Sequence, residues 1–444
     1  MKIIVQIAVH MGAGAGKAIS GLALLDKINR HRIILLDKPQ KFNHIDKCRE
    51  SGVDVIICPN WHLYQEMIRQ ADVVIVNWWH HPLVYKALID IRDIPVRLMI
   101  WGHVNGINYP VMSSRFLQEF EACLFTSEAS FENSFWEGNK ANEIREKSEL
   151  VYGMGDFIPE LFKSKDSYEI QESIRIGYIG SLDYAKLNPE FIQWLKLAVK
   201  DNRKIIFEIA GDTTPEVERD IEDAQISQCV HLLGYRNDIQ ELLVSWDIFV
   251  YPLAHGNFAT TENALIEAMA CGLPIIAGDS EIEKSIIDDK VTGLIISDSN
   301  GFLKAIQDLI SDEELRRSLG ISARTAAIKK YDINSNLMRF HSVVEKTLKV
   351  EKNTHDFTAE IGEEPFEWFL SGCESERKEG IMQILELAKR NDKKKDLKVR
   401  VNSLGKIMLG KEKGSVGQFA RCYPEDERLK ALSDIINNFT KADL

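Results

Sequence analysis

The sequence predicts an α/β protein made of two tandem Rossmann-like domains, each a doubly wound parallel sheet, followed by a small helical extension. Three observations lead to this fold class. Short apolar runs alternate with amphipathic stretches over residues 1–350. The runs are rich in Val and Ile and lack polar alternation, as expected of parallel strands that helices cover on both faces. The alternation stops at the polar stretch Lys163–Glu172 and then starts again, which indicates a second domain.

The first domain is expected over residues 1–160. Its strands are expected at six apolar runs, with helices such as Lys17–Ile28 and Pro82–Ile91 between them. The runs are Ile3–Val9, Arg32–Leu36, Val53–Ile57, Val73–Asn77, Val96–Ile100 and Ala122–Phe125.

The second domain is expected over residues 173–350. Its helices are expected to include Glu190–Val199, Asp238–Ser245 and Glu262–Cys271, and a long helix, Asp332–Val350, closes it. Its strands are expected at Ile174–Ile179, Ile205–Ile209, Val230–Leu232, Ile248–Tyr251, Pro274–Ala277 and Gly293–Ile296. Because ligands of such sheets bind beyond the carboxyl ends of the strands, we expect the two sheets to face each other across a cleft.

The last part of the chain has a different composition. The acidic stretch Glu351–Glu364 is typical of a linker, and residues 365–444 are expected to form a helical accessory region. This region contains a basic run from Lys389 to Arg400, which includes Lys393, Lys394 and Lys395. The run could contact anionic lipid headgroups at the inner face of a membrane, or it could simply be a solvated helix face.

Composition excludes several classes of protein. The net charge of the 444 residues is −12, which argues against a nucleic-acid partner. No run of eighteen apolar residues is present, so no membrane span is expected. The seven cysteines form no C-x-x-C pair, which favours a reducing, cytoplasmic compartment over a disulfide framework or a thiolate zinc site.

A glycine-rich loop follows the first predicted strand. Gly12, Gly14 and Gly16 would let the backbone approach a phosphate at a helix N-terminus. Neither named motif fits completely: a P-loop needs Gly where Met11 stands, and a dinucleotide fingerprint needs Gly where Lys17 stands. The alternative is a tight strand-to-helix turn that binds no ligand.

Histidines follow two predicted strands. His103 comes directly after the run Val96–Ile100 and next to glycines, where its imidazole could hydrogen-bond a sugar hydroxyl or assist proton transfer. The alternative is a solvent-exposed loop histidine. The cluster Trp78–His81 lies at the end of the preceding strand, and without an acidic residue at metal-ligand spacing we expect no metal there.

The segment Tyr251–Pro274 carries the strongest signal. A strand ends at Tyr251, a loop with His255 and Gly256 follows, and a helix begins near Thr260–Glu262. Glu262 could merely cap this helix. Glu267 lies mid-helix among apolar neighbours, where a carboxylate is costly unless a partner binds it.

Residues 248–277 resemble the signature segment of retaining glycosyltransferases of the GT-B architecture, glycosyltransferase family 4. Further matches occur in the family's order: Ile176–Lys186, Phe207–Asp212, Val230–Asp238, Val291–Leu294 and the closing helix. The resemblance spans roughly residues 1–350 and is specific between residues 174 and 296. It implies transfer of a sugar from a nucleotide-sugar donor to a glycan or lipid-linked acceptor, in surface polysaccharide synthesis.

The resemblance also implies roles for residues. Lys186 would neutralise the donor diphosphate, Glu267 would bind the donor ribose, and His103 would contact the transferred sugar. Backbone N–H groups near Ala259–Thr261, which include those of Thr260 and Thr261, would hold the leaving phosphate. No metal and no cofactor would be needed, because these groups stabilise the diphosphate.

Two departures from the family pattern affect this site. Ala259 stands where the family usually has Glu, and Glu262 or His255 could replace that carboxylate. Ser181 stands where the family usually has a diphosphate-binding Arg. Glu262 is therefore a candidate catalytic residue with His103 and Glu267, while a non-catalytic nucleotide-sugar or glycan-binding relative and a GT-B nucleotide-sugar epimerase remain alternatives.

Overall fold

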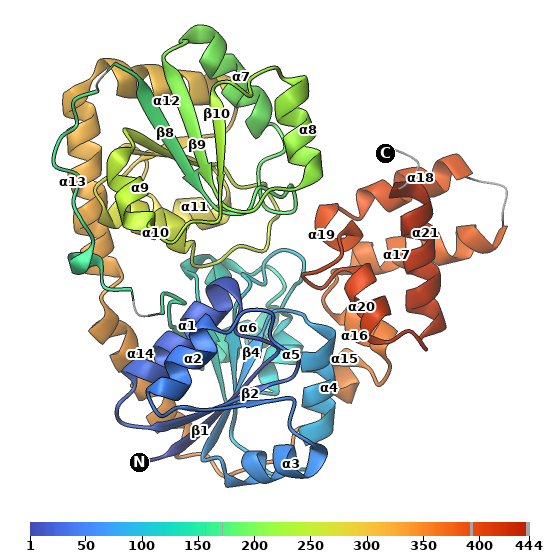
Figure 1. Cartoon of the computed structure of the whole chain (residues 1–444). Helices are drawn as coiled ribbons and strands as arrows, with labels where there is room; N and C mark the ends of the chain where they lie inside the picture. Colours follow the sequence, from blue (N-terminus) through green and yellow to red (C-terminus); the bar gives the residue numbers. More distant parts are fainter. Residues whose placement is uncertain (156, 171, 391–393, 441–444) are drawn as a thin grey trace. The chain divides into compact units, whose positions relative to one another are not determined.

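The computed structural model describes the chain except for residues 156, 171, 391–393 and 441–444 (Figure 1). The chain forms two compact units. The first contains residues 1–156 and 336–444, and the second contains residues 157–335.

A parallel sheet of seven strands forms the centre of the first unit. In sheet order the strands are β3 (Asp54–Ile57), β2 (Arg30–Leu35), β1 (Ile3–Ala8), β4 (Val73–Trp78), β5 (Leu98–Gly102), β6 (Ala122–Phe125) and β7 (Ser148–Leu150). Every residue of β4 and β5 is buried, which explains their mainly apolar sequences. The six predicted strands are confirmed to within two residues at each end, but the short, partly exposed β7 was not predicted.

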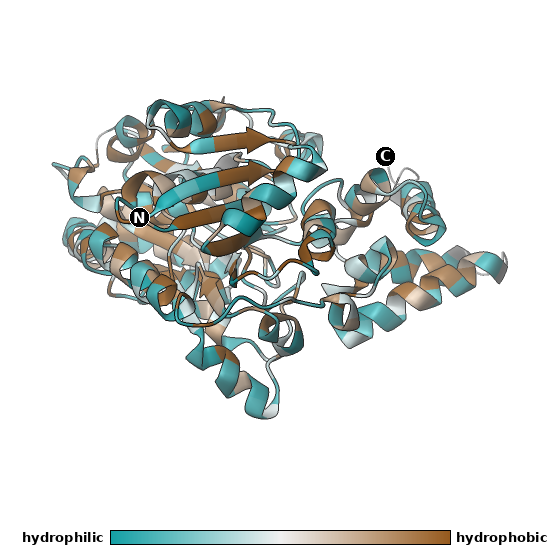
Figure 2. Cartoon of the chain, turned by 90° about the horizontal axis from the view of Figure 1, so that it is seen from below, coloured by the Kyte–Doolittle hydropathy of each residue, from teal (hydrophilic) through white to brown (hydrophobic). Residues whose placement is uncertain are grey.

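Helices connect these strands. They are α1 (Ala13–Leu25), α2 (Asn43–Glu50), α3 (Trp61–Gln70), α4 (Pro82–Ile91), α5 (Ser114–Gln118) and α6 (Gly138–Glu146). Local signals set several of their starts: the side chain of Asn60 accepts a hydrogen bond from the Leu63 amide, and Pro82 is the first residue of α4. In Figure 2 several strands are largely hydrophobic, whereas the helices carry both colours, as expected of helices with one buried face.

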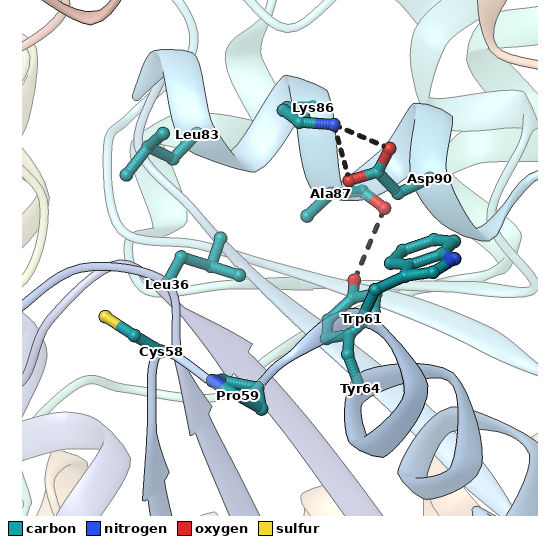
Figure 3. Close-up of a pocket in the computed structure, with 9 residues that line it drawn as sticks. All are labelled: Leu36, Cys58, Pro59, Trp61, Tyr64, Leu83, Lys86, Ala87 and Asp90. Carbon is teal, nitrogen blue, oxygen red and sulfur yellow. Dashed lines mark hydrogen bonds and ion pairs between the residues drawn. The ribbon is translucent and has the colours of Figure 1, made fainter.

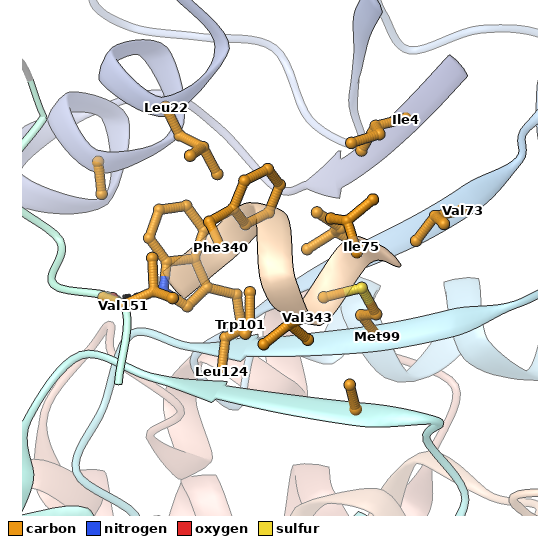
Figure 4. Close-up of a cluster of buried hydrophobic side chains, with 13 residues drawn as sticks. Ile4, Leu22, Val73, Ile75, Met99, Trp101, Leu124, Val151, Phe340 and Val343 are labelled. Atoms are coloured by element: carbon orange, nitrogen blue, oxygen red, sulfur yellow. Dashed lines mark hydrogen bonds between the residues drawn. The ribbon is translucent and has the colours of Figure 1, made fainter. Parts of the chain in front are cut away.

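The helix α14 (Ile333–Thr347) packs onto the first sheet (Figure 4). Its Phe340 and Val343 join Trp101, Ile75 and Leu22 in one buried cluster. The Arg339 Nε donates a hydrogen bond of 2.8 Å to the Leu150 carbonyl. The closing helix of the predicted second domain therefore packs mainly in the first unit.

The second unit contains a parallel sheet of six strands. In sheet order they are β10 (Val230–Gly234), β9 (Ile205–Ala210), β8 (Ile174–Ile179), β11 (Ile248–Tyr251), β12 (Ile275–Gly278) and β13 (Leu294–Ile296). Its helices are α7 (Phe191–Asp201), α8 (Pro215–Asp223), α9 (Ile239–Ser245), α10 (Asn263–Ala270), α11 (Glu281–Ile286), α12 (Ser299–Ser311) and α13 (Glu313–Lys330). All six strands agree with the apolar runs of the sequence.

The C-terminal helices share a compact unit with the first sheet. They are α15 (Thr358–Ile361), α16 (Pro365–Ser371), α17 (Ser375–Arg390), α18 (Lys394–Ser403), α19 (Lys406–Leu409), α20 (Val416–Cys422) and α21 (Glu427–Thr440). Both α16 and α20 contact α4. The Tyr109 hydroxyl donates a hydrogen bond of 2.5 Å to the Gly414 carbonyl, and the Val111 amide donates one of 2.9 Å to the Gly372 carbonyl.

The stretch 351–364 is packed, which differs from the linker that its composition suggested. Asn353 pairs with Val96 in a short β-bridge. Phe357 and His355 are buried, and the His355 Nε2 lies 3.5 Å from a carboxylate oxygen of Glu121. Because the stretch is mainly acidic, its composition did not indicate that the side chains of His355 and Phe357 pack into the first unit. Among the described residues, no helix is long and apolar enough to cross a bilayer.

Candidate functional site

The glycine-rich loop starts α1 at the carboxyl end of β1. Gly12 is the residue before the helix, and its amide donates a hydrogen bond of 3.1 Å to the His10 Nδ1. A side chain at Gly16 would place its Cβ 2.2 Å from the Met11 carbonyl oxygen, so this close turn requires glycine. Gly14 is exposed, and a Cβ there would meet nothing within 4 Å. The tight turn therefore explains Gly16, whereas it places no such demand on Gly14.

His103 lies directly after β5 and is held from two sides. Its backbone amide donates a hydrogen bond of 2.9 Å to the Trp78 carbonyl, and its Nε2 lies 2.8 Å from the Asn77 Oδ1. The indole rings of Trp101 and Trp79 lie 4.8 Å and 5.9 Å from its ring centroid. Burial lowers the pKa of His103 to about 3, so the imidazole is neutral near pH 7. The histidine is thus a half-buried, oriented residue rather than a solvent-exposed loop residue.

Two further histidines of the same sheet edge are buried. His80 and His81 have pKa values that burial lowers to about 3. The His80 Nδ1 lies 2.5 Å from the Tyr85 hydroxyl, and a Cβ on Gly414 would lie 2.6 Å from the His80 Cδ2. The cluster Trp78–His81 therefore forms part of the contact with the C-terminal helices. Within the described part of the chain, no three His, Cys, Asp or Glu residues form a group that could hold a metal ion.

A pocket of about 530 Å³ opens at the carboxyl ends of β2 and β3, between α3 and α4 (Figure 3). Its walls are mainly apolar, and the exposed indole of Trp61 stacks on the ring of Tyr64 with centroids 5.6 Å apart. The Lys86 Nζ lies 2.8 Å from a carboxylate oxygen of Asp90. The lining residues are Leu36, Cys58, Pro59, Trp61, Tyr64, Leu83, Lys86, Ala87 and Asp90.

In the second unit, Lys186 and Glu262 form a buried ion pair. The Lys186 Nζ lies 2.6 Å from the Glu262 Oε2 and 3.2 Å from the Tyr251 hydroxyl. The Tyr251 hydroxyl also donates a hydrogen bond to the Glu262 Oε2. Burial, followed by the negative charge of Glu262, raises the pKa of Tyr251, so its hydroxyl stays protonated. These three groups lie after β8 and at the end of β11, where the sequence predicted the donor site.

Glu262 does not cap the following helix with its side chain. It occupies the N-cap position of α10, but no capping hydrogen bond is formed, and its carboxylate binds Lys186 instead. Glu267 lies within α10 and is partly exposed. The structure therefore brings Lys186 and Glu262 into direct contact.

The other site residues predicted in the second unit lie close to Lys186 or Glu262 in the sequence. His255 is exposed, with its Nε2 2.8 Å from the Asp279 Oδ1. Ser181 is exposed, and Thr260 and Thr261 are half-buried in the loop before α10. The Ala259 amide donates a hydrogen bond of 2.7 Å to the Asn257 Oδ1, so this N–H already has a partner.

Glu283 is a buried carboxyl group that sequence reasoning missed. It accepts hydrogen bonds from the backbone amides of Leu253, Gly278 and Ser280, which follow β11 or end β12. Burial raises its pKa to about 8, although the three N–H donors favour its ionised form. The signal was present in the sequence as Ser280-x-x-Glu283, a capping box at the start of α11. Glu283 holds two strand-end loops of the predicted donor site in place.

Residues 173–312 match the protein family described as Glycosyl transferases group 1. This segment is therefore similar to a group 1 glycosyltransferase domain. It contains every strand of the second sheet and both members of the Lys186–Glu262 pair.

Curated relatives of the glycosyltransferase domain match over limited lengths. N-acetyl-alpha-D-glucosaminyl L-malate synthase of Bacillus anthracis is 23% identical over 226 residues, which cover 48% of this chain and 58% of the relative. N,N'-diacetylbacillosaminyl-diphospho-undecaprenol alpha-1,3-N-acetylgalactosaminyltransferase of Campylobacter jejuni is 34% identical over 125 residues, which cover 28% of this chain and 32% of the relative. The chain therefore spans little more than half of the first relative and about a third of the second.

A solved structure confirms the architecture. Anabaena HepE in complex with UDP and glucose aligns with 78% of this chain and 100% of its own, with a TM-score of 0.64 and 16% identity. The two sheets thus have the GT-B fold, as the resemblance implied, and the chain adds a helical C-terminal extension.

Proposed function

We propose that the protein is a retaining, metal-independent glycosyltransferase that moves a sugar from a nucleotide diphosphate sugar to a glycan or lipid-linked acceptor. The observation that supports this most is the buried Lys186–Glu262–Tyr251 cluster inside the glycosyltransferase domain. A cation held at the carboxyl ends of parallel strands is suited to a diphosphate. The names of relatives from capsular polysaccharide and lipopolysaccharide synthesis favour a role in surface polysaccharide assembly.

The proposed roles follow from chemistry. The bond from the sugar to the diphosphate breaks, and the negative charge that develops on the leaving phosphate is stabilised by Lys186 and by backbone N–H groups before α10. Glu267 binds the ribose hydroxyls. Glu262 positions Lys186 and takes the place of the carboxylate that Ala259 lacks. The acceptor oxygen bonds to the anomeric carbon on the face from which the diphosphate leaves, and the acceptor hydroxyl gives its proton to the departing phosphate.

The acceptor is placed on the first unit. The pocket beside Trp61 offers an aromatic ring and the polar pair Lys86–Asp90, a combination that suits a sugar ring. Exposed basic residues of the C-terminal helices, among them Lys389, Lys395 and Arg400, would bring the enzyme to an anionic membrane. Lys393 of this basic run lies outside the described residues.

The membrane contact has a direct test. Flotation with vesicles containing anionic lipid should recover the wild-type chain, and charge reversal at Lys395 and Lys398 should reduce recovery. Equal recovery of both proteins would show that the basic run is an ordinary solvated face.

A second candidate function is binding of a nucleotide sugar or glycan without turnover. It is favoured by the ion pair itself, because Glu262 already neutralises Lys186, and by Ser181 in place of a second cation. In that case the site binds donors and releases them unchanged.

The deciding experiment combines binding with turnover. Thermal shifts with UDP, GDP and ADP identify the base, and a panel of nucleotide sugars is then assayed for release of the nucleoside diphosphate with lipid-linked and glycan acceptors. Lys186→Ala and Glu267→Ala should each lower turnover strongly, while Lys196→Ala, an exposed lysine of α7, should not. Binding without turnover for every donor would favour the second candidate, and full activity of both site variants would show that the site is wrong.

A further inference from the structure

A chain of hydrogen bonds runs through the interior of the first unit and ends at His103. The Nε2 atoms of His341 and His31 lie 3.0 Å and 2.9 Å from the two carboxylate oxygens of Asp26. The His31 Nδ1 lies 3.0 Å from the Gln6 Nε2. The Asn77 Nδ2 then donates a hydrogen bond of 3.3 Å to the Gln6 Oε1, and the Asn77 Oδ1 lies 2.8 Å from the His103 Nε2.

The interior of this relay is buried among apolar strands. Gln6 and Asn77 are 0% exposed, and His31 and Asp26 are 3% exposed. The relay crosses the neighbouring strands β2, β1, β4 and β5 in order. Polar groups at such positions are expensive unless each one is paired, so a relay in which every donor meets an acceptor is strongly preferred over any alternative arrangement.

Two groups that can only accept hydrogen bonds determine the direction of the relay. The Ile7 carbonyl accepts a hydrogen bond of 3.2 Å from the Asn77 Nδ2, which turns the Asn77 Oδ1 toward His103. The Asp26 carboxylate, whose pKa is lowered by its hydrogen bonds to His31 and Asn29 despite burial, is ionised and requires a proton on the His31 Nε2.

Gln6 satisfies both ends of the relay. A neutral His31 with its proton on Nε2 leaves Nδ1 as an acceptor for the Gln6 amide. A second proton on His31 would force the Gln6 amide to turn over, and its NH₂ group would then face the Asn77 NH₂ group. The Ile7 carbonyl and the Asp26 carboxylate therefore determine the orientation of each amide and imidazole in the relay, so the orientations do not depend on how the O and N atoms of a single amide are assigned.

We propose that this relay holds His103 as the neutral tautomer protonated at Nε2, so that its Nδ1 is free of a proton and accepts a hydrogen bond from a hydroxyl of the transferred sugar. Asn77 acts as a positioning residue, and Gln6, His31 and Asp26 support it. The ligand in this proposal rests on the proposed function, whereas the tautomer does not. A neutral acceptor suits a sugar hydroxyl, which can donate a hydrogen bond.

NMR of the histidine rings tests the proposed tautomer of His103 directly. The full chain is labelled with ¹⁵N at histidine, and two-bond ¹H–¹⁵N correlations distinguish protonated from unprotonated ring nitrogens. The signals of His103 are identified by their loss in His103→Gln. We expect a slowly exchanging proton on Nε2 and an unprotonated Nδ1. A proton on Nδ1, or an equal mixture of the two forms, would overturn the proposal.

Variants separate positioning from stability. Asn77→Leu should let His103 exchange between tautomers and lower turnover by about tenfold, as for one lost hydrogen bond, with little change in the donor KM. Thr126→Val is the matched control, because it removes a buried hydrogen bond of 2.9 Å to the Gly102 carbonyl at the same sheet edge and keeps the Asn77 side chain that binds His103. A purely structural role for Asn77 would lower the Tm but leave the tautomer and the turnover of the folded enzyme unchanged.

A titration distinguishes this inference from the proposed function. UDP-glucose and UDP-N-acetylglucosamine are added to the labelled chain, and we expect the Nδ1 resonance of His103 to move more than its Nε2 resonance. If the tautomer is as proposed but neither donor moves either resonance, the sugar contact is wrong while the relay stands. If a donor binds and turns over while His103 carries its proton on Nδ1, the relay is wrong while the proposed function stands.

Discussion

Replacing Lys186 and Glu262 singly and together measures how strongly the two side chains are coupled. Their charged atoms lie 2.6 Å apart, and the side chains are only 19% and 7% exposed. At this distance the Coulomb attraction is about 6 kcal/mol at an effective dielectric constant of about 20, and desolvation of both groups offsets roughly two thirds of it. We therefore expect a coupling free energy of about 2 kcal/mol.

Lys186→Met and Glu262→Gln preserve most of the volume of each side chain. Each single substitution should reduce the free energy of unfolding of the second unit by about 3 kcal/mol, because it leaves the partner charge buried without a counter-charge. The double variant should cost about 2 kcal/mol less than the two single costs together. Hydrogen exchange of the amides of β11 and α10 in increasing urea measures the stability of this unit by itself.

The reasoning would be refuted by additive effects. A coupling of less than about 0.5 kcal/mol is what independent sites show. In that case Glu262 would act on the helix alone, with a loss of about 1 kcal/mol that does not depend on Lys186.

Three further predictions concern buried groups of the two units. Acidification from pH 7 to pH 5 should lower the free energy of unfolding, measured in urea, by about 3 kcal/mol. Each of the three histidines with a pKa of about 3 binds a proton in this range only in the unfolded chain, which lowers the free energy of unfolding by about 2 kcal/mol per histidine. Glu283, with a pKa of about 8, binds its proton more tightly in the folded chain and raises the free energy of unfolding by about 3 kcal/mol. Stability that is constant or higher at pH 5 would contradict these buried states. Gly414→Ala should lower the free energy of unfolding by about 1–3 kcal/mol, since its φ is +78° and the new Cβ would press on His80, whereas Gly380→Ala in α17 meets nothing within 4 Å and should be neutral or stabilising. Phe340→Ala should cost about 3–5 kcal/mol by leaving a cavity against the sheet, and a cost below 1 kcal/mol would show that α14 is not anchored there.

The sequence predicted the strands well because their apolar runs are continuous and flanked by polar turns. It predicted His103 and Lys186 in loops that follow strands, and Glu262 at the start of the helix after the next such loop, because parallel strands present their carboxyl ends at one edge of the sheet. The pairing of Lys186 with Glu262 required the three-dimensional path of two loops about 76 residues apart, which no local pattern contains. The attachment of the C-terminal helices was missed for the same reason: its contacts join Tyr109 and Val111 to residues far along the chain.

The hydrogen-bond relay corresponds to one feature of the sequence, the presence of polar residues in otherwise apolar runs. Gln6 interrupts the apolar run Ile3–Val9, and Asn77 ends the run that begins at Val73. A single polar residue in a buried strand predicts that a partner exists, because an unpaired one would be too costly, but it does not say which residue the partner is. The partners here come from neighbouring strands that are adjacent only after the sheet has formed.

The two units prepare different electrostatic environments for the proposed reaction. In the second unit Lys186 is paired with a carboxylate and lies beside a protonated tyrosine, and in the proposed reaction this cation stabilises the departing diphosphate. In the first unit burial keeps His103 neutral, and the relay gives that neutral ring one defined acceptor atom. A histidine without this relay would present a donor as often as an acceptor. Ala259 is only 3% exposed and its amide is bound to Asn257, and the carboxylate that pairs with Lys186 stands three residues later, at the N-cap of α10.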